Sequence, residues 1–350
     1  MAPLLLLLLA LPLRAGAPEP AWIGKRPPEL AGKHLVWFNG PPVTLASLRG
    51  KVVLLDIWDG TCINCLRTLP YLRAWHQRYA PDGLRIIGIH CPEFAFEQDP
   101  AIVREFIAAQ GLRYPVVADN AFEIWKAFGN AYWPRKWLID RDGIIRADHA
   151  GEGDYGRTEE RIQGLLRALH PGRVYPPPLA AVRPEDAPGA VCYPRSDELY
   201  LGAERGSFGG PGPVTRGRAA VYRDAPRHVE GSYYLRGAWT SRPQCIRSMA
   251  NDAALLIRFH GTEVNVVLRS DTAEPLAVRV TLDGADLTER DRGEDVAILP
   301  SGESRLTVRR AGMFRVIRTP AFGHHELAFA PSAPGLEAYV LTFGSCVVPR

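Results

Sequence analysis

The sequence lacks the patterns that mark several common classes of protein. Its 42 basic and 38 acidic residues are interspersed without a block of Lys or Arg, so the net charge of +4 gives no indication of a nucleic-acid partner. The longest apolar run, Pro3–Leu13, is too short to cross a bilayer. Hydrophobic residues make up 46% of the 350 residues, which excludes a disordered chain and allows two or three globular domains.

Cysteine is scarce, and of the six cysteines only Cys62 and Cys65 lie close together. A structural zinc site typically needs a second Cys-x-x-Cys pair or paired histidines at ligand spacing, and the sequence has neither. Covalent haem attachment needs a histidine directly after the second cysteine, where this chain has Leu66. A structural disulfide between these two cysteines would close too short a loop to stabilise much. The pair therefore favours redox chemistry, and we expect neither a metal nor an organic cofactor.

The two cysteines lie where a strand is expected to become a helix. Val52–Trp58 is a β-branched and aromatic run with the length of a buried strand, and apolar residues recur at helical spacing after Asn64. Because the N–H groups and dipole of a helix N-terminus stabilise an anion, Cys62 is expected to be the attacking thiolate. Cys65, one turn further on, is expected to resolve the mixed disulfide.

An acid precedes the cysteine pair inside the same apolar strand. Burying the carboxylate of Asp56 is unfavourable unless it has a role, and the role we expect is to accept the proton of Cys65. This acid, Trp58, the Cys-x-x-Cys pair and Pro70 together resemble thioredoxin-like proteins.

The chain around this motif alternates strands and helices. His34–Phe38 and Pro42–Leu48 predict a short hairpin ahead of the central strand. Further strands are predicted at Leu84–His90, Tyr114–Ala118, Lys136–Asp140 and Ile144–His149. With helical patterns between and after them, residues 28–172 are predicted to form a thioredoxin-like α/β domain.

Trp133 and Pro134 precede one of these strands, where thioredoxin-like folds carry a cis proline beside the cysteines. This resemblance implies a cis bond before Pro134. Such a bond would expose the backbone of Trp133 to an extended substrate, which would then bind by strand addition.

Longer segments resemble one family more closely. TCINCLRTLPYL, GIHCPEFAFE, NAYWPRKWLIDRDG and GEGDYGRTE are similar to the TlpA-related domain of DipZ-type thiol–disulfide proteins. SDELYLG and LEAYVLTFG resemble the C-terminal module that accompanies that domain. The resemblance implies a jelly-roll module and an electron supply from a separate membrane thiol-electron transporter of the CcdA type.

The C-terminal part has a different pattern. Residues 173–195 are rich in proline and predict a semi-rigid linker, and residues 196–350 predict an all-β sandwich like a carbohydrate-binding module. Strands are expected at Ala219–Arg223, Tyr233–Trp239, Ala254–His260, Val264–Arg269, Ala277–Leu282, Arg305–Arg309, Phe314–Arg318 and Ala338–Phe343. Trp239, Tyr233 and Tyr234 could stack on a sugar, although core aromatics are the simpler interpretation. His324 and His325 are adjacent, so on a strand they would point to opposite faces and not form a ligand pair.

Four cysteines remain outside the motif. Cys91 follows a predicted strand at the edge where α/β sites gather, so it lies either near Cys62 or in the core as a small hydrophobe. Cys192, Cys245 and Cys346 are an odd number, so at least one is free or bonds outside the module, and their pairing stays open.

Residues 1–17 predict an export signal. A leucine-rich segment ends at small residues typical of a cleavage site, although no basic residue precedes it. The expected location is therefore periplasmic or secreted, with an uncleaved anchor as the alternative.

The sequence as a whole predicts an extracytoplasmic thiol–disulfide oxidoreductase that reduces disulfides of client proteins. One alternative is an envelope or glycan-binding protein in which the redox fold is a passive platform. The other is a thiol-dependent peroxidase, which is disfavoured because no Pro-x-x-x-Thr-x-x-Cys stretch surrounds Cys62.

Overall fold

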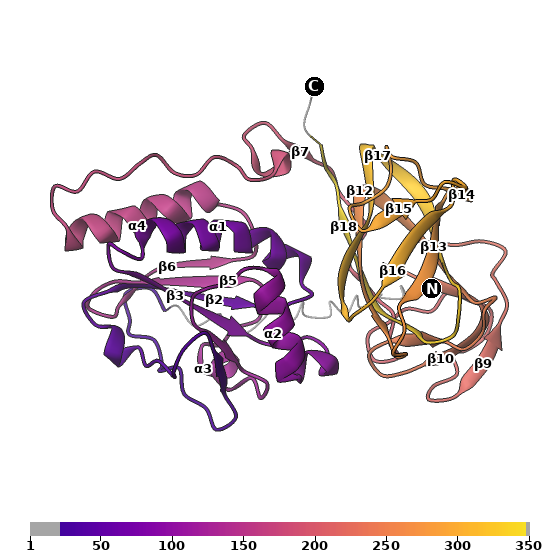
Figure 1. Ribbon diagram of the computed structural model, residues 1–350, viewed down its shortest axis with the longest axis horizontal. Coiled ribbons are helices and arrows are strands. Elements are labelled where there is room, and N and C mark those ends of the chain that lie inside the picture. Colours follow the sequence, from indigo (N-terminus) through magenta and orange to yellow (C-terminus); the bar gives the residue numbers. More distant parts are fainter. Residues whose placement is uncertain (1–21, 348–350) are drawn as a thin grey trace, which may run out of the picture.

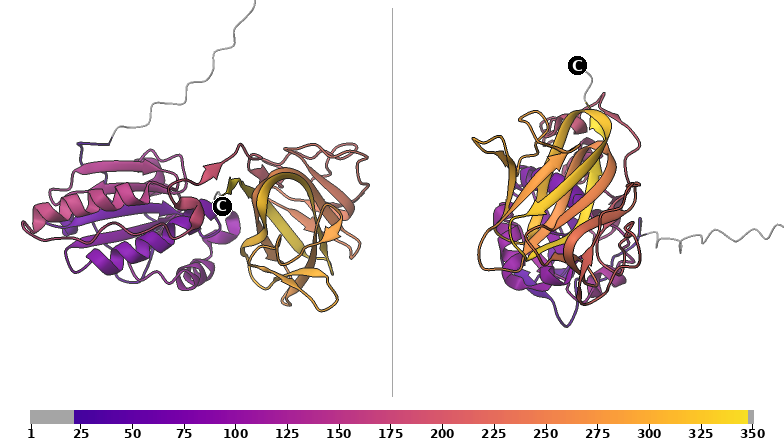
Figure 2. Two further views of the ribbon diagram at one scale, coloured as in Figure 1. Left: turned by 90° about the horizontal axis from the view of Figure 1, so that it is seen from above. Right: turned by 90° about the vertical axis from the view of Figure 1, so that its right-hand side faces the viewer.

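The computed structural model describes residues 22–347 and consists of two bodies that lie side by side (Figures 1 and 2). The first is a helix-flanked sheet and the second is built of strands. The expected signal segment, residues 1–17, lies outside the described residues. Within residues 22–347, no helix combines the length and the hydropathy required to cross a membrane.

The N-terminal body contains a six-stranded sheet. In spatial order its strands are β1 (Val36–Phe38), β4 (Val116–Ala118), β3 (Leu84–His90), β2 (Val52–Trp58), β5 (Arg135–Ile139) and β6 (Ile145–Ala150). β2, β3 and β4 run parallel, whereas β1, β5 and β6 run antiparallel to their neighbours. Parallel strands are covered on both faces, which explains why their runs are continuously apolar.

Helices cover both faces of this sheet. They are α1 (Ile63–Tyr79), α2 (Pro100–Ala109), α3 (Glu123–Ala127) and α4 (Tyr155–Leu169). Leu54 and Trp58 pack in a core with α1, α2 and α4, whereas Leu55 and Ile57 pack in the core that contains α3. Because side chains alternate along a strand, Asp56 faces the α1 side. Figure 1 shows α1 and α4 on one side of the sheet and α3 on the other.

The expected hairpin ahead of β2 is wrong. β1 pairs with β4, from which it is separated by about half of the domain, and residues 42–48 form no strand but contain the short 3₁₀ helix η1 (Ala46–Leu48). The apolar side chains of β1 are partly or fully buried at the edge of the sheet beside β4. Tertiary packing therefore decides this pairing.

The proline-rich segment between the two bodies packs more closely on the first body than its composition predicts. The backbone N–H of Leu179 donates to Glu159 of α4, and the N–H of Val182 donates to the Tyr71 hydroxyl of α1. A short 3₁₀ helix, η3 (Pro184–Asp186), follows. The segment up to Asp186 is therefore attached to α1 and α4 and is not a free spacer.

The C-terminal body is an all-β sandwich whose strands wrap around one apolar core (Figure 1). Its strands are β8 (Leu199–Tyr200), β9 (Ala219–Tyr222), β10 (Tyr233–Ser241), β11 (Ile246–Ser248), β12 (Ala254–Ser270), β13 (Leu276–Leu282), β14 (Ala285–Asp286), β15 (Val296–Ile298), β16 (Ser304–Val308), β17 (Gly312–Pro331) and β18 (Leu336–Gly344). Trp239, Tyr233 and Tyr234 are at most 1% exposed, so they are core residues and not a sugar-stacking surface.

Strand β12 joins the two halves of the sandwich. Two strands were expected over residues 254–269, but the chain stays extended through Gly261 and only shifts its register against β17 there. A Cβ atom at Gly261 would lie 2.6 Å from the carbonyl oxygen of Gly344, so this close backbone approach requires glycine. A bulge lets one long strand bend between two layers without a break in pairing.

A disulfide joins the two ends of the C-terminal body. Cys192 in β7 (Val191–Cys192) is bonded to Cys346 in β19 (Cys346–Val347), and the two short strands pair antiparallel. Cys245 is free and buried, as the odd number of cysteines allowed.

Candidate active site

The Cys-x-x-Cys pair lies at the N-terminus of α1. Cys62 is the N-cap residue, and its sulfur accepts a hydrogen bond from the backbone N–H of Cys65 at 3.3 Å. The two sulfurs are 2.6 Å apart, and both cysteines are free. Cys62 is half-buried, whereas Cys65 is completely buried. Only Cys62 can therefore meet a substrate.

Burial also keeps the second cysteine protonated. Desolvation, followed by the hydrogen bond with Cys62, raises the pKa of Cys65 well above that of a free thiol. A thiol in this state cannot attack until another group removes its proton.

Asp56 and Lys136 form a buried pair beneath the cysteines. They are direct cross-strand partners on β2 and β5, and both are at most 2% exposed. Burial raises the pKa of Asp56 to about 7, although the charge of Lys136 opposes the rise. No residue among 22–347 donates a hydrogen bond to the carboxylate of Asp56. The carboxylate is therefore poised to take up a proton near neutral pH.

Lys136 was missed in the sequence analysis, although it lies on a predicted strand. Burial lowers its pKa, and the neighbouring carboxyl group of Asp56 opposes this. The sequence did contain a sign of this buried charge. Lys136 lies two residues before the buried Leu138, so on a strand both side chains point to the same inward face.

The peptide bond between Trp133 and Pro134 is cis, as the resemblance predicted. The indole N–H of Trp133 donates to the carbonyl oxygen of Cys91 at 3.0 Å, and its ring lies 4.3 Å from that of Trp125. Trp133 thus has a fixed orientation at the rim beside Cys62.

A second pair of acids lies on the other side of the motif. Asp59 and Glu97 are both fully buried, and the Thr61 hydroxyl oxygen lies 3.0 Å from Asp59 Oδ2 and 2.5 Å from Glu97 Oε1. Burial and the negative charge of Asp59 raise the pKa of Glu97 well above its usual value. His90 Nε2 lies 3.3 Å from Asp59 Oδ1. Thr61, the residue directly before Cys62, therefore links the two buried acids.

Glu97 also organises the segment that precedes α2. Its Oε2 accepts the backbone N–H groups of Glu93 and Phe94 at 2.9 and 2.8 Å, which holds the 3₁₀ helix η2 (Ala95–Gln98). Sequence reasoning missed Asp59 and Glu97 because 38 residues separate them and only the fold brings them together.

The C-terminal body forms one wall of the cleft that contains Cys62. The cleft has a volume of about 90 Å³. Its residues from the first body are Thr61, Cys62, Ile63, Asn64, Glu93 and Trp133, and those from the second are Glu198, Tyr200, Asn265, Val267, Met313, Val340 and Thr342. β18 lies at the edge of the sandwich that faces the first body (Figure 1). The cleft that contains Cys62 therefore lies between the two bodies.

Polar and apolar contacts hold this wall in place. Glu93 accepts hydrogen bonds from Tyr200 at 2.7 Å and Arg205 at 2.9 Å. The ring of Tyr339 lies 5.0 Å from those of Phe94 and Phe96. The contact is thus partly apolar, as in a stable interface.

An ion pair joins the bodies next to the cleft. Arg67 of α1 lies 2.8 Å from Glu263 of β12 and 3.0 Å from Glu152. Burial alone would raise the pKa of Glu263, but Arg67 and Asn265 hold it below its usual value. Glu263 is therefore ionised in its contact with Arg67.

Cys91 belongs to the core on the α3 side of the sheet. It is fully buried, its thiol lies 3.9 Å from Asp119, and burial raises its pKa well above the usual value. Of the two alternatives for Cys91, the structure therefore shows the buried core residue.

Comparisons with known proteins agree with this architecture. Residues 23–148 match the AhpC/TSA family, and residues 196–344 match the family described as thioredoxin-like C-terminal domain. Protein DipZ of Mycobacterium tuberculosis is 39% identical over 236 residues, which cover 66% of this chain and 33% of DipZ. Thiol-disulfide oxidoreductase ResA of Bacillus thuringiensis is 31% identical over 153 residues, which cover 44% of this chain and 82% of ResA.

A solved structure described as a thioredoxin-like protein in the oxidized form is 29% identical, with a TM-score of 0.38 over 41% of this chain and 96% of that one. The cysteine pair at the start of α1 and the similarity to ResA, most of whose length is covered, define a thioredoxin-like thiol–disulfide oxidoreductase, and the chain belongs to this family. Within the family it is similar to DipZ, and a β-rich C-terminal module follows its thioredoxin-like domain. The chain spans about one third of the length of the DipZ proteins it matches.

Proposed function

We propose that this protein reduces disulfides of client proteins outside the cytoplasm, with Cys62 and Cys65 as its dithiol. The observation that carries the proposal is the asymmetry of the pair, in which a half-buried sulfur lies 2.6 Å from a buried one. The disulfide between Cys192 and Cys346 supports an oxidising location, since such bonds are rare in the cytosol.

The first step is attack by the Cys62 thiolate on a client disulfide. A bond forms between the Cys62 sulfur and one client sulfur, the client S–S bond breaks, and the departing client thiolate takes a proton from solvent. Cys65 then passes its proton to Asp56 and attacks the Cys62 sulfur, which breaks the mixed disulfide and releases the second client sulfur as a thiolate that takes a proton from solvent. The products are a Cys62–Cys65 disulfide and a client that has gained two electrons and two protons.

The oxidised pair must then be reduced again. A separate membrane thiol-electron transporter of the CcdA type is the proposed donor, and its dithiol would reduce the Cys62–Cys65 bond by the same exchange in reverse. The narrow cleft favours an extended client segment, which Trp133 and the cis Pro134 would position by strand addition. A glycan or another envelope component as ligand of the sandwich is a further proposal, and the buried aromatic residues give it no support.

Turnover of insulin disulfides tests the proposal. We expect wild-type protein to reduce insulin with dithiothreitol as electron source, Cys62→Ser to be inactive, and Cys65→Ser to accumulate mixed disulfides with insulin because the resolving thiol is gone. Non-reducing electrophoresis detects these adducts.

Two results would change the assignment. Trapping by Cys62→Ser but not by Cys65→Ser would reverse the two roles. An absence of turnover at high protein concentration would instead favour a binding protein with a passive redox fold.

A further inference from the structure

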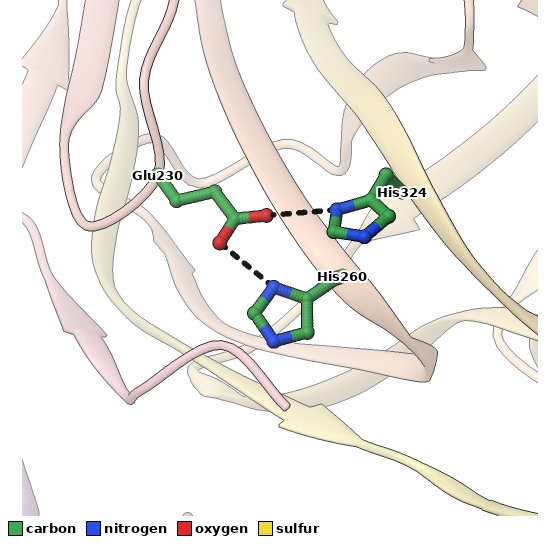
Figure 3. A group of neighbouring side chains, drawn as sticks. All are labelled: Glu230, His260 and His324. Carbon is green, nitrogen blue, oxygen red and sulfur yellow. Dashed lines mark hydrogen bonds and ion pairs between the residues drawn. The ribbon is translucent and has the colours of Figure 1, made fainter. Parts of the chain in front are cut away.

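Two histidines and one glutamate converge on the outside of the sandwich. His260 of β12 and His324 of β17 are direct cross-strand partners, so their side chains leave the sheet on the same face. Glu230 reaches the same point from the loop between β9 and β10. Figure 3 shows the carboxylate between the two imidazole rings.

The potential ligand atoms are already close together. His260 Nδ1 lies 2.7 Å from one carboxylate oxygen of Glu230, and His324 Nδ1 lies 3.3 Å from the other. One ligand atom from each residue lies within 4.8 Å of the other two. With metal–ligand distances of about 2.0–2.1 Å, the ligand atoms of a tetrahedral zinc ion are about 3.4 Å apart. Small rotations of the His324 and Glu230 side chains would bring the three ligand atoms to the distances that one ion requires.

The surroundings restrict how these side chains can move. The Ser196 hydroxyl lies 3.3 Å from His260 Nδ1 and accepts the backbone N–H of His260 at 2.8 Å. The ring of Phe322 lies 5.8 Å from that of His260 and 6.2 Å from that of His324. His260 is thus partly preoriented, while His324, with 64% of its side chain exposed, can adjust.

The neighbouring histidine belongs to the opposite face. His325 Nδ1 lies 2.7 Å from Asp283 Oδ2. His324 and His325 therefore point to opposite faces of the strand and do not form a ligand pair, as expected. His324 instead lies beside His260 of β12, a pairing that the sequence did not reveal.

We propose that Glu230, His260 and His324 bind one divalent transition-metal ion of the zinc class. Two imidazole nitrogens and one carboxylate oxygen form a ligand set that zinc sites use with a fourth position left open to water or a ligand. The ion would join β12, β17 and the loop between β9 and β10. Through Ser196 it would also hold the first residues of the sandwich. This site is separate from the dithiol, and the proposal does not depend on the redox function.

The test titrates Zn²⁺ into protein with Cys62→Ser and Cys65→Ser, because free thiols would compete for the metal. A chromophoric chelator reports the affinity, and Co²⁺ absorption in the same protein reports the coordination geometry. We expect one equivalent to bind and to raise the thermal unfolding temperature. His324→Ala and Glu230→Gln should each weaken binding by more than about 100-fold, since even the loss of groups behind the ligands typically costs 10–100-fold.

His325→Ala on the same strand is the matched control and should bind as tightly as the parent. Circular dichroism checks that each variant is folded, and the exposure of His324 makes its replacement the safer one. The proposal is overturned by a parent protein that binds no stoichiometric zinc, which would leave only a histidine–carboxylate ion network. Equal binding by the His324→Ala variant would overturn it as well.

Discussion

Asp56 is buried beside one cation, and its pKa of about 7 places its titration in the range where thiol exchange operates. The largest cause is desolvation, which favours the neutral acid, while Lys136 favours the carboxylate. Cys65 must instead lose a proton, because burial raises its pKa and keeps it a thiol until a base is available. The proposed transfer of a proton from Cys65 to Asp56 therefore requires Asp56 in its ionised form.

Replacing Asp56 with Asn should remove this base. In the wild type, resolution of a mixed disulfide should become faster as the pH rises through about 7, because Asp56 becomes ionised. The variant should lack this rise and resolve about 100-fold more slowly at pH 8, the lower end of typical general-base effects. Stopped-flow thiol release between pH 5 and 9 measures both profiles. Identical profiles would remove Asp56 from the mechanism.

The same substitution should change how stability depends on pH. The pKa of Asp56 is raised in the folded state, so the folded protein holds a proton that the unfolded chain has released, and stability falls as the pH rises from about 4 to about 7. The loss attributable to this residue is at most about 4 kcal/mol, from the difference between 3.8 and about 7. Urea unfolding at pH 5 and pH 8 should show a smaller decline for Asp56→Asn than for wild type.

At the scale of elements, the short helix η2 depends on one buried acid. Glu97 accepts two backbone N–H groups, contacts the Thr61 hydroxyl and faces Asp59. Burial and the nearby Asp59 raise the pKa of Glu97 and so favour its neutral form, which a glutamine amide resembles in shape.

Glu97→Ala should therefore destabilise the protein by about 3 kcal/mol, because buried donors lose their acceptor, while Glu97→Gln should cost less than about 1 kcal/mol. Chemical denaturation measures both values. The alanine variant should also weaken the contact of Phe94 and Phe96 with Tyr339, which limited proteolysis between the two bodies would detect. Equal stability of the two variants would show that the acceptor role of Glu97 is unimportant.

The sequence predicted the elements whose signal is local. A continuous apolar run predicted β2, and the helical spacing of apolar residues predicted α1. The position of the cysteine pair between them followed from these two patterns. The partner of β1 and the continuity of β12 through Gly261 did not follow, since both depend on contacts between distant parts of the chain. Lys136 and Glu97 were missed for the same reason: no spacing in the sequence shows which buried charges meet across a sheet or a loop.

At the scale of the whole molecule, the sandwich is part of the environment of Cys62. Val267 and Val340 line the cleft, Tyr339 packs on the first body, and Arg67 pairs with Glu263. A client that reaches Cys62 must fit between the bodies or displace one of them. We therefore expect the sandwich to restrict which segments can reach Cys62, whether or not it also binds a ligand.

Because the proline-rich segment is attached to the first body, the stability of that body on its own should depend on where the chain is truncated. A truncated protein covering residues 25–172 contains all residues proposed for the dithiol chemistry and should still reduce a small disulfide. It loses the bonds of Leu179 to Glu159 and of Val182 to Tyr71, which a protein covering residues 25–188 keeps. The longer form should be more stable by about 1–2 kcal/mol, the value of two hydrogen bonds, as measured by urea unfolding.

Both truncations should also expose the active-site thiol. In a Cys65→Ser background, Cys62 should react with iodoacetamide several-fold faster in the protein covering residues 25–188 than in the full chain, because the wall formed by β12 and β18 is absent. Phe94 and Phe96 would become exposed at the same time, so the truncated proteins should be less soluble. An equal alkylation rate would mean that the cleft stands open in solution. Loss of activity toward a small disulfide that needs no docking would instead make the sandwich part of the active unit.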